Sequence, residues 1–208
     1  MKDTNLFSGK KALVFGGSGG VGTEVINRFK TLGVSIPAPS SQELNLYNIE
    51  EKDIAVYCRD FEPDIIVNVA ACSTTDEDGL LDMFDKVFNI NLKSNLVLID
   101  YAKHLGKRVN IVLFSSSSTK GRENLTLYSA TKAGLNSIVE NLAEKMSKSG
   151  VYINAIIPEK INTPMIQKLH KGNVKYLELL EVDDVIDAVL YYSIANVFGE
   201  LSHIRKGL

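Results

Sequence analysis

Apolar residues in this chain follow two alternating patterns, short unbroken runs and longer stretches with helical spacing. Unbroken runs are typical of strands buried on both faces of a parallel sheet, and spaced stretches are typical of helices with one buried face. The unbroken runs predict strands at 11–17, 34–39, 64–71, 109–116, 151–158 and 200–207, with a further short strand at 43–46. The spaced stretches predict helices at 21–33, 47–61, 79–104, 126–150 and 183–196.

This alternation of strands and helices indicates an α/β fold, a doubly wound parallel sheet (Rossmann fold) with right-handed crossovers. The chain has 208 residues, 45% of them hydrophobic, which is enough for one substantial core but not for two large domains. We therefore expect a single domain over 1–208. Ligands of such sheets bind beyond the carboxyl ends of the strands, and the glycine and polar clusters of this sequence fall at those ends.

The glycine-rich string FGGSGGVG, at 15–22, joins the first predicted strand to the first predicted helix. Glycines at this junction let the backbone approach a pyrophosphate, whose charge is met by amides and by the positive end of the helix. A flexible turn without a ligand is the alternative, but the position in the fold favours a dinucleotide site. The predicted contacts are Gly16, Ser18, Gly19, Gly20, Val21 and Gly22.

Charge and cysteine content narrow the possible partners. The formal net charge of −2 provides no basic field for nucleic acid, and no apolar stretch approaches the roughly 18 residues that span a bilayer. Cys58 and Cys72 stand fourteen residues apart without a Cys-x-x-Cys motif or a histidine pair, so we expect no metal site. Few cysteines also fit a reducing compartment, and we expect a cytoplasmic protein.

Tyr128 and Lys132, in the stretch LYSATKAGL, lie four residues apart and therefore on one face of a helix. A phenol and an ammonium so placed can share a catalytic site. They can equally be two exposed side chains, so the pair needs support from other motifs.

Several motifs, in the right order, give that support, because they resemble those of the short-chain dehydrogenases/reductases. The family's Thr-Gly-x-x-x-Gly-x-Gly string matches 15–22, with Phe15 in place of threonine, and its Asn-x-Ala-Gly matches 68–71, with Ala71 in place of glycine. The stretch YSATKAG resembles the family's Tyr-x-x-x-Lys motif, and VYINAIIPEKINTPM resembles the segment that follows its sixth strand.

The resemblance implies an NAD(P)-dependent oxidoreductase that interconverts a small-molecule carbonyl and a secondary alcohol. The implied catalytic residues are Asn91, Ser116, Tyr128 and Lys132. Tyr128 would exchange the proton, Lys132 would lower the pKa of that phenol, and Asn91 would hold a water. Counting back thirteen residues from Tyr128 selects Ser115 instead, but strand ends are held more firmly than loop lengths and favour Ser116.

The resemblance also assigns further residues to the cofactor: Ser40, Asn45, Leu46, Asn68, Ala70, Ala71, Tyr128, Lys132, Pro158, Ile161 and Thr163. Asn68 fits a purely structural role equally well. The position of the acid that binds the adenosine ribose reads Ser40 or Ser41, so a 2′-phosphate is not repelled and NADP is favoured slightly over NAD. Glu159 replaces a glycine of the family pattern and either narrows the pocket or faces solvent.

The segment 159–182 corresponds to the family's substrate lid. A homodimer or homotetramer is expected through the helices at 79–104 and 126–150, because Leu80, Leu81, Phe84 and Phe88 supply surplus apolar surface. Two other functions remain open, a non-catalytic NAD(P)-binding sensor or scaffold and a nucleotide-sugar epimerase or reductase. Few residues follow 158, which disfavours the extra substrate domain of the second.

Overall fold

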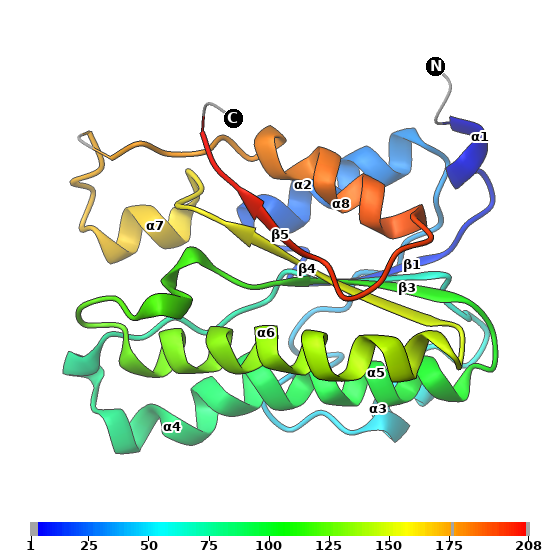
Figure 1. Ribbon diagram of the computed structural model, residues 1–208, viewed down its shortest axis with the longest axis horizontal. Coiled ribbons are helices and arrows are strands. Elements are labelled where there is room, and N and C mark those ends of the chain that lie inside the picture. The colour runs from blue at the N-terminus through cyan, green and yellow to red at the C-terminus, as the bar shows by residue number, and fades with distance from the viewer. Residues whose placement is uncertain (1–3, 176, 207–208) are drawn as a thin grey trace.

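A five-stranded parallel sheet forms the centre of the computed structural model, which describes residues 4–175 and 177–206 (Figure 1). The strands lie in the order β1-β2-β3-β4-β5. Their bounds are β1 Ala12–Phe15, β2 Ile65–Asn68, β3 Val109–Phe114, β4 Val151–Pro158 and β5 Leu201–Ile204. Nearly every residue of β1 to β4 is buried, which explains why these strands read as unbroken apolar runs.

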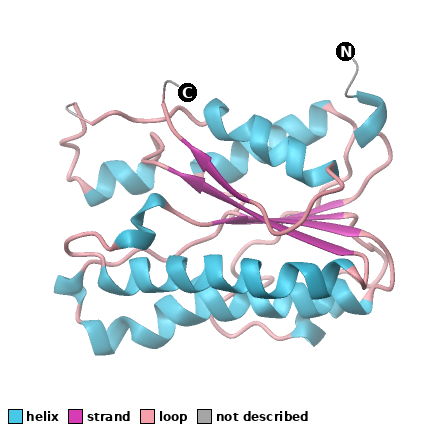
Figure 2. Ribbon diagram, viewed as in Figure 1, coloured by secondary structure: helices cyan, strands magenta, loops and turns pink. Residues whose placement is uncertain are grey.

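Helices cover both faces of the sheet (Figures 1 and 2). One face carries α1 (Thr4–Phe7), α2 (Gly20–Thr31) and α8 (Asp183–Ile194), and the other carries α3 (Glu51–Tyr57), α4 (Leu80–Phe88), α5 (Ser94–His104) and α6 (Thr126–Ser147). Successive strand residues enter opposite cores, so Leu13 belongs to the same core cluster as Leu135 of α6, whereas Val14 belongs to the cluster that contains Phe29 of α2. The predicted doubly wound parallel fold is confirmed.

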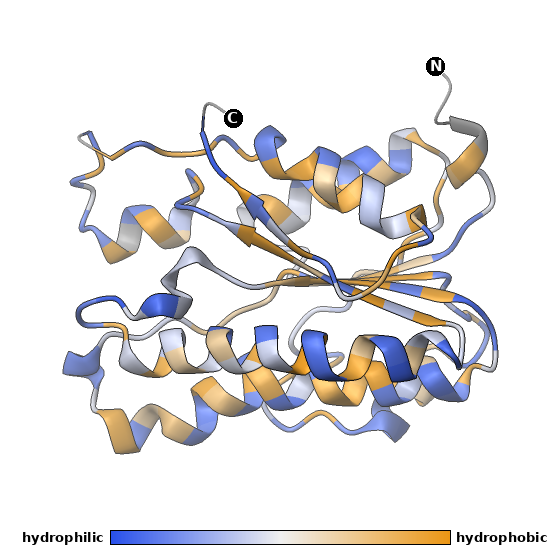
Figure 3. Ribbon diagram, in the orientation of Figure 1, coloured by the Kyte–Doolittle hydropathy of each residue, from blue (hydrophilic) through white to orange (hydrophobic). Residues whose placement is uncertain are grey.

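Hydropathy follows these layers (Figure 3). The central strands are mainly apolar, β5 at the edge is partly polar, and the long helices alternate apolar and polar stripes. Within the described ranges, the structure contains no helix with the length and apolar character needed to cross a bilayer.

The predicted strand at 34–39 is only an extended segment beside β1. The Ala12 amide donates to the Ser35 carbonyl oxygen at 2.8 Å, and the Ser35 amide donates to the Lys10 carbonyl oxygen at 2.9 Å. Pro37 and Pro39 have no N–H group, so a regular ladder cannot continue. The predicted strand at 43–46 is wrong, because these residues form turns.

The long helix predicted at 79–104 is three consecutive segments. A π-helical turn, Asn89–Lys93 (η2), separates α4 from α5. Two 3-10 turns, η1 (Asp76–Asp78) and η3 (Ser117–Lys120), precede α4 and α6. The helix predicted from residue 47 begins only at Glu51, where the side chains of Glu50 and Asp53 cap each other's backbone amides.

Candidate active site

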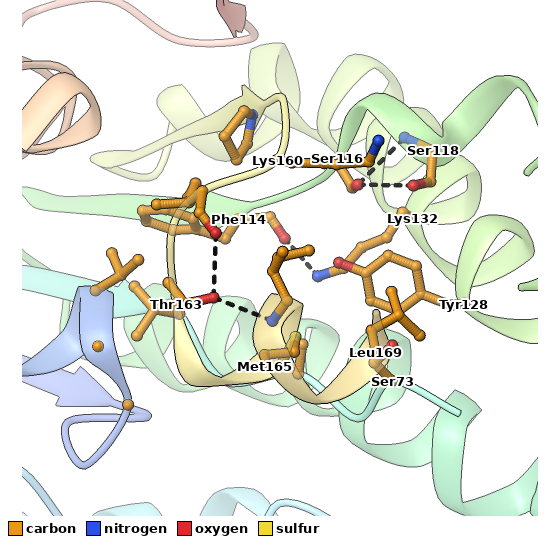
Figure 4. Close-up of a pocket in the computed structure, with 18 of the residues that line it drawn as sticks. Ser73, Phe114, Ser116, Ser118, Tyr128, Lys132, Lys160, Thr163, Met165 and Leu169 are labelled. Atoms are coloured by element: carbon orange, nitrogen blue, oxygen red, sulfur yellow. Dashed lines mark hydrogen bonds between the residues drawn. The ribbon is translucent and has the colours of Figure 1, made fainter. Parts of the chain in front are cut away.

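A cavity of about 270 Å³ lies beyond the carboxyl ends of the central strands and is closed on one side by α7 (Pro164–Leu169) (Figure 4). Its wall combines the glycine turn, the serine run after β3, two side chains of α6 and the segment after β4. Most of the residues predicted for the site line it: Gly16, Ser18, Gly19, Gly20, Val21, Gly22, Ala71, Ser116, Tyr128, Lys132, Pro158, Ile161 and Thr163.

The glycine turn is packed so closely at Gly16 and Gly22 that these two positions exclude a side chain. A Cβ on Gly16, whose φ is +79°, would lie 2.7 Å from the Ala70 amide nitrogen, and a Cβ on Gly22 would lie 2.1 Å from the Gly16 carbonyl oxygen. The twelve-residue helix α2 begins at Gly20, so its unpaired amides and positive dipole end face the cavity wall. This arrangement fits a pyrophosphate.

Two neighbouring serines after β3 point in different directions. Ser115 is buried, and its hydroxyl donates to the Lys132 carbonyl oxygen at 3.3 Å. Ser116 Oγ accepts a hydrogen bond from the Ser118 amide at 3.2 Å and lies close enough to Tyr128 to lower the pKa of that phenol. Figure 4 shows Ser116 and Tyr128 on the same cavity. The geometry therefore favours Ser116 over Ser115 as the serine beside the phenol.

Lys132 is buried beneath Tyr128. Its ammonium lies 5.5 Å from the centre of the phenol ring and donates a 2.6 Å hydrogen bond to the Phe114 carbonyl oxygen at the end of β3. Burial lowers the pKa of Lys132 to about 8, because desolvation disfavours its charged form. Lys132 is thus held in the cavity wall by the last strand carbonyl.

The pKa of Tyr128 is raised in this structure, mainly by burial. The groups that oppose this effect are the Ser116 hydroxyl and the charge of Arg122, so the expected lowering by Lys132 is not found. The Lys132 ammonium is directed at Phe114 instead. Arg122 lines the cavity and was missed from the sequence, where its only signal was its place in the loop between Ser116 and Tyr128.

Asn91 does not line the cavity. Its side-chain oxygen accepts a hydrogen bond from the Cys72 amide at 2.7 Å, and its side-chain nitrogen donates to the Cys72 carbonyl oxygen and to Thr131 Oγ1 at 2.9 and 3.1 Å. Asn91 therefore ties the loop after β2 to the residue before Lys132. Its predicted role in holding a water stays a prediction.

Asn68 extends this buried amide network and also lies away from the cavity. Its side-chain nitrogen donates to Asn95 Oδ1 at 2.8 Å, and its oxygen accepts from the Ala70 amide at 3.1 Å. Asn95 in turn donates to the Asn91 carbonyl oxygen at 2.8 Å. These contacts support the structural role of Asn68. Ala70 does not line the cavity, but its backbone packs against Gly16 of the glycine turn.

The residues predicted for the adenosine end lie outside the cavity, on a turn beside the glycine string. Ser40 donates from its amide and its hydroxyl to Glu43 Oε2, both at 2.8 Å, and the backbone bond lowers the pKa of Glu43. Asn45 Oδ1 accepts from the Tyr47 amide at 3.0 Å, and Leu46 packs on the core. The Glu43 carboxylate therefore lies beside Ser40, at a position where the sequence pattern indicated no acid.

Glu159 is exposed at the rim. One of its carboxylate oxygens lies 3.9 Å from Arg205 Nε, and the residue also contributes to the cavity wall. Of the two alternatives for this replacement of glycine, the structure favours a side chain that faces solvent and borders the cavity mouth.

Comparisons with known proteins bear on the family of the chain. A family model described as enoyl-(acyl carrier protein) reductase matches residues 59–189. The chain is 30% identical to the 3-oxoacyl-[acyl-carrier-protein] reductase FabG of Rickettsia typhi, with 97% of this chain and 98% of that protein covered. It is 27% identical to an uncharacterized oxidoreductase of Staphylococcus epidermidis, with 88% and 90% covered.

Two solved structures share the fold. A short chain dehydrogenase from Leptospira borgpetersenii with bound NAD+ gives a TM-score of 0.82 at 21% identity, covering 98% of this chain and 94% of that one. A 3-ketoacyl-(acyl-carrier-protein) reductase from Brucella melitensis complexed with NADH gives 0.80 at 20% identity, covering 97% and 98%. The family and the enzyme class expected from the motifs are confirmed: the chain belongs to the short-chain dehydrogenases/reductases, a family of NAD(P)-dependent oxidoreductases.

Proposed function

We propose that this enzyme interconverts a carbonyl and a secondary alcohol, with Tyr128 as the group that exchanges the proton. The observation that carries the proposal is that Ser116, Tyr128 and Lys132 meet in one cavity with the glycine turn (Figure 4). A nicotinamide cofactor, when bound, supplies or accepts the hydride. The close backbone packing at Gly16 and Gly22 and the open end of α2 fit its pyrophosphate.

The remaining cofactor contacts are assigned by family resemblance. Lys132 would hold the nicotinamide ribose, and Pro158, Ile161 and Thr163 would border the carboxamide; all four line the cavity. The wall that they form is mainly apolar, and it would keep water from the reacting carbon.

Proton transfer in the reduction direction follows from the state of Tyr128. Because burial raises its pKa, the phenol is protonated at neutral pH and can donate to the developing alkoxide. The Ser116 hydroxyl, beside the phenol, would orient the substrate oxygen. Oxidation of an alcohol requires the deprotonated phenol, which Ser116 and Arg122 favour. Lys132, with a pKa of about 8, is largely charged at pH 7.

The preference between NAD and NADP depends on Glu43. The sequence favoured NADP because no acid was expected near Ser40. In the structure, the Glu43 carboxylate is hydrogen-bonded to Ser40, so an acid does lie there. A carboxylate at this position accepts hydrogen bonds from ribose hydroxyls and repels a 2′-phosphate. We therefore propose that NAD binds at least as well as NADP.

The two ends of the predicted lid, 159–182, are joined by backbone hydrogen bonds. The Asn162 amide donates to the Leu180 carbonyl oxygen, and the Leu180 amide donates to the Lys160 carbonyl oxygen, both at 2.8 Å. Met165, Ile166 and Leu169 on α7 line the cavity between those ends. This geometry supports a segment that covers the substrate as one unit.

A homo-oligomer is proposed through the exposed apolar side of α4. Leu81 is 90% exposed, and Leu80 and Phe84 are 42% and 43% exposed. Phe84 stacks on Phe88 with ring centres 4.2 Å apart. An isologous pairing of this side would cover these side chains. The scarcity of cysteines supports a cytoplasmic location.

Fluorescence titration with NADH and NADPH, followed by a screen of carbonyl compounds for cofactor oxidation, tests the proposed function. The enzyme should bind a cofactor and oxidise it only when a suitable carbonyl is present. Binding without turnover of any carbonyl would favour a sensor or scaffold. The Gly16→Val variant is a control, because its side chain would meet the Ala70 backbone and should abolish cofactor binding.

A further inference from the structure

A second recess, of about 580 Å³, opens beside the catalytic cavity near the carboxyl ends of β4 and β5. Four residues line both hollows: Ser117, Arg122, Glu159 and Lys160. The rest of the recess comes from the turn after β3, from β4, from β5 and the residue after it, and from the lid. The two hollows thus share a wall, which these four residues form.

The recess concentrates positive charge in a chain whose formal net charge is −2. Lys120, Arg122, Lys160 and Arg205 line it, against the carboxylates of Glu159 and Glu178. Arg205 already faces Glu159, at 3.9 Å. The other three cations face the single remaining carboxylate of Glu178, so the recess has a surplus of two positive charges.

These three cations are not neutralised by an ion pair within the part of the chain that the structure describes. Across residues 4–175 and 177–206, no ion pair within 4.0 Å involves Lys120, Arg122 or Lys160. Cations that outnumber the carboxylates of a recess raise the local concentration of anions and bind them through charge-assisted hydrogen bonds.

Arg122 connects this charge to the reacting group. It lines both hollows, and its charge acts on the phenol of Tyr128. A guanidinium presents two parallel N–H groups that match the two oxygens of a carboxylate or phosphate. An anion bound by Arg122 would therefore lie within the length of a small molecule from Tyr128.

We infer that the recess binds an anionic group of the substrate, so that the enzyme acts on carbonyl compounds bearing a carboxylate or phosphate near the carbonyl carbon. This inference rests on the proposed function of the adjoining cavity. Arg122 and Lys160 hold the anion at the shared wall, and Lys120 adds to the attraction. The apolar wall near Tyr128 receives the carbonyl.

Matched pairs of substrates test the inference with the enzyme and its preferred reduced cofactor. Acetoacetate is compared with methyl acetoacetate, and dihydroxyacetone phosphate with dihydroxyacetone. At least one anionic member should have a kcat/KM tenfold or more above its neutral partner, about 1.4 kcal/mol. The pair that shows this preference tells whether the anion is a carboxylate or a phosphate.

Variants then show which residues cause the preference for the anionic substrate. Lys160→Gln should reduce the preference for the anionic member at least fivefold, mainly through KM, while the neutral member changes less than twofold. Arg122→Gln should reduce the preference by a similar factor, and it is judged by the ratio of the two members alone, because the charge of Arg122 also acts on Tyr128. Arg59→Gln, an exposed arginine beyond α3, is the matched control and should leave the preference intact.

These experiments distinguish a failure of the anion site from a failure of the proposed function. Turnover of neutral carbonyls without preference for either anion, or a preference that survives both variants, overturns the anion site and leaves the proposed function standing. No turnover of any carbonyl counts against the proposed function. In that case calorimetric titration of the cofactor complex with acetoacetate and with inorganic phosphate still tests the recess. Binding that Arg122→Gln abolishes supports it, and no binding overturns it.

Discussion

Lys132→Met replaces a buried ammonium with an apolar side chain of similar length. In the wild type, burial lowers the pKa of Lys132 from 10.5 to about 8. That difference corresponds to a cost of roughly 3 kcal/mol for holding the charged form in the folded protein. The variant also loses the 2.6 Å hydrogen bond to Phe114, so its stability at a single pH mixes two effects.

The pH dependence separates these effects. Between about pH 8 and pH 10.5 the folded wild type binds fewer protons at Lys132 than the unfolded chain does, so its stability rises with pH in that window. The cost is fully present below pH 8 and disappears above pH 10.5. Between pH 7 and pH 9.5 the wild type should therefore gain roughly 2 kcal/mol relative to Lys132→Met.

Urea unfolding of both proteins at pH 7 and pH 9.5 measures this difference. Tyr128 and all other groups are present in both proteins, so their titration largely cancels. The control is Lys145→Met, an exposed lysine on the same helix, whose difference from the wild type should stay constant within about 0.5 kcal/mol. If the difference in unfolding free energy between the wild type and Lys132→Met is also the same at both pH values, Lys132 is not a desolvated ammonium and the reasoning is refuted.

Two further predictions concern the cofactor and the assembly. Glu43→Gln should raise the affinity for NADPH relative to NADH about tenfold, close to 1.4 kcal/mol, because it removes the carboxylate bound to Ser40; calorimetry that finds the ratio unchanged would remove Glu43 from the cofactor site. Light scattering should give the wild type a mass well above the 22.9 kDa of one chain, and Leu81→Asp should return it to that mass; a wild-type monomer at micromolar concentration contradicts the proposed oligomer.

The sequence predicted the sheet well because full burial leaves a clear pattern. The runs at 64–71, 109–116 and 151–158 are apolar almost throughout, and all three are central strands. The stretch at 43–46 was wrongly predicted to be a strand because Leu44 and Leu46 alternate with polar residues, as apolar residues do in a half-buried strand. Its conformation is set instead by the bonds from Ser40 to Glu43, which periodicity does not register.

The site was predicted where function depends on local spacing and missed where it depends on loop closure. Tyr128 and Lys132 are one helical turn apart, so their proximity follows from the sequence. Arg122 and Glu43 reach their positions only through turns that bring them back to the site. The direction of the Lys132 ammonium could not be predicted either, because the Phe114 carbonyl that accepts its hydrogen bond belongs to a distant strand.

Steady-state turnover of Tyr128→Phe tests the central claim most directly. The variant loses only the hydroxyl and keeps the ring, so folding and cofactor binding should persist while turnover falls about 10²- to 10⁴-fold, the usual worth of general acid–base assistance. Tyr191→Phe, on the exposed side of α8, is the matched control and should keep wild-type turnover. A Tyr128→Phe enzyme that retains more than half of the wild-type turnover would contradict the assignment of Tyr128 as the proton donor.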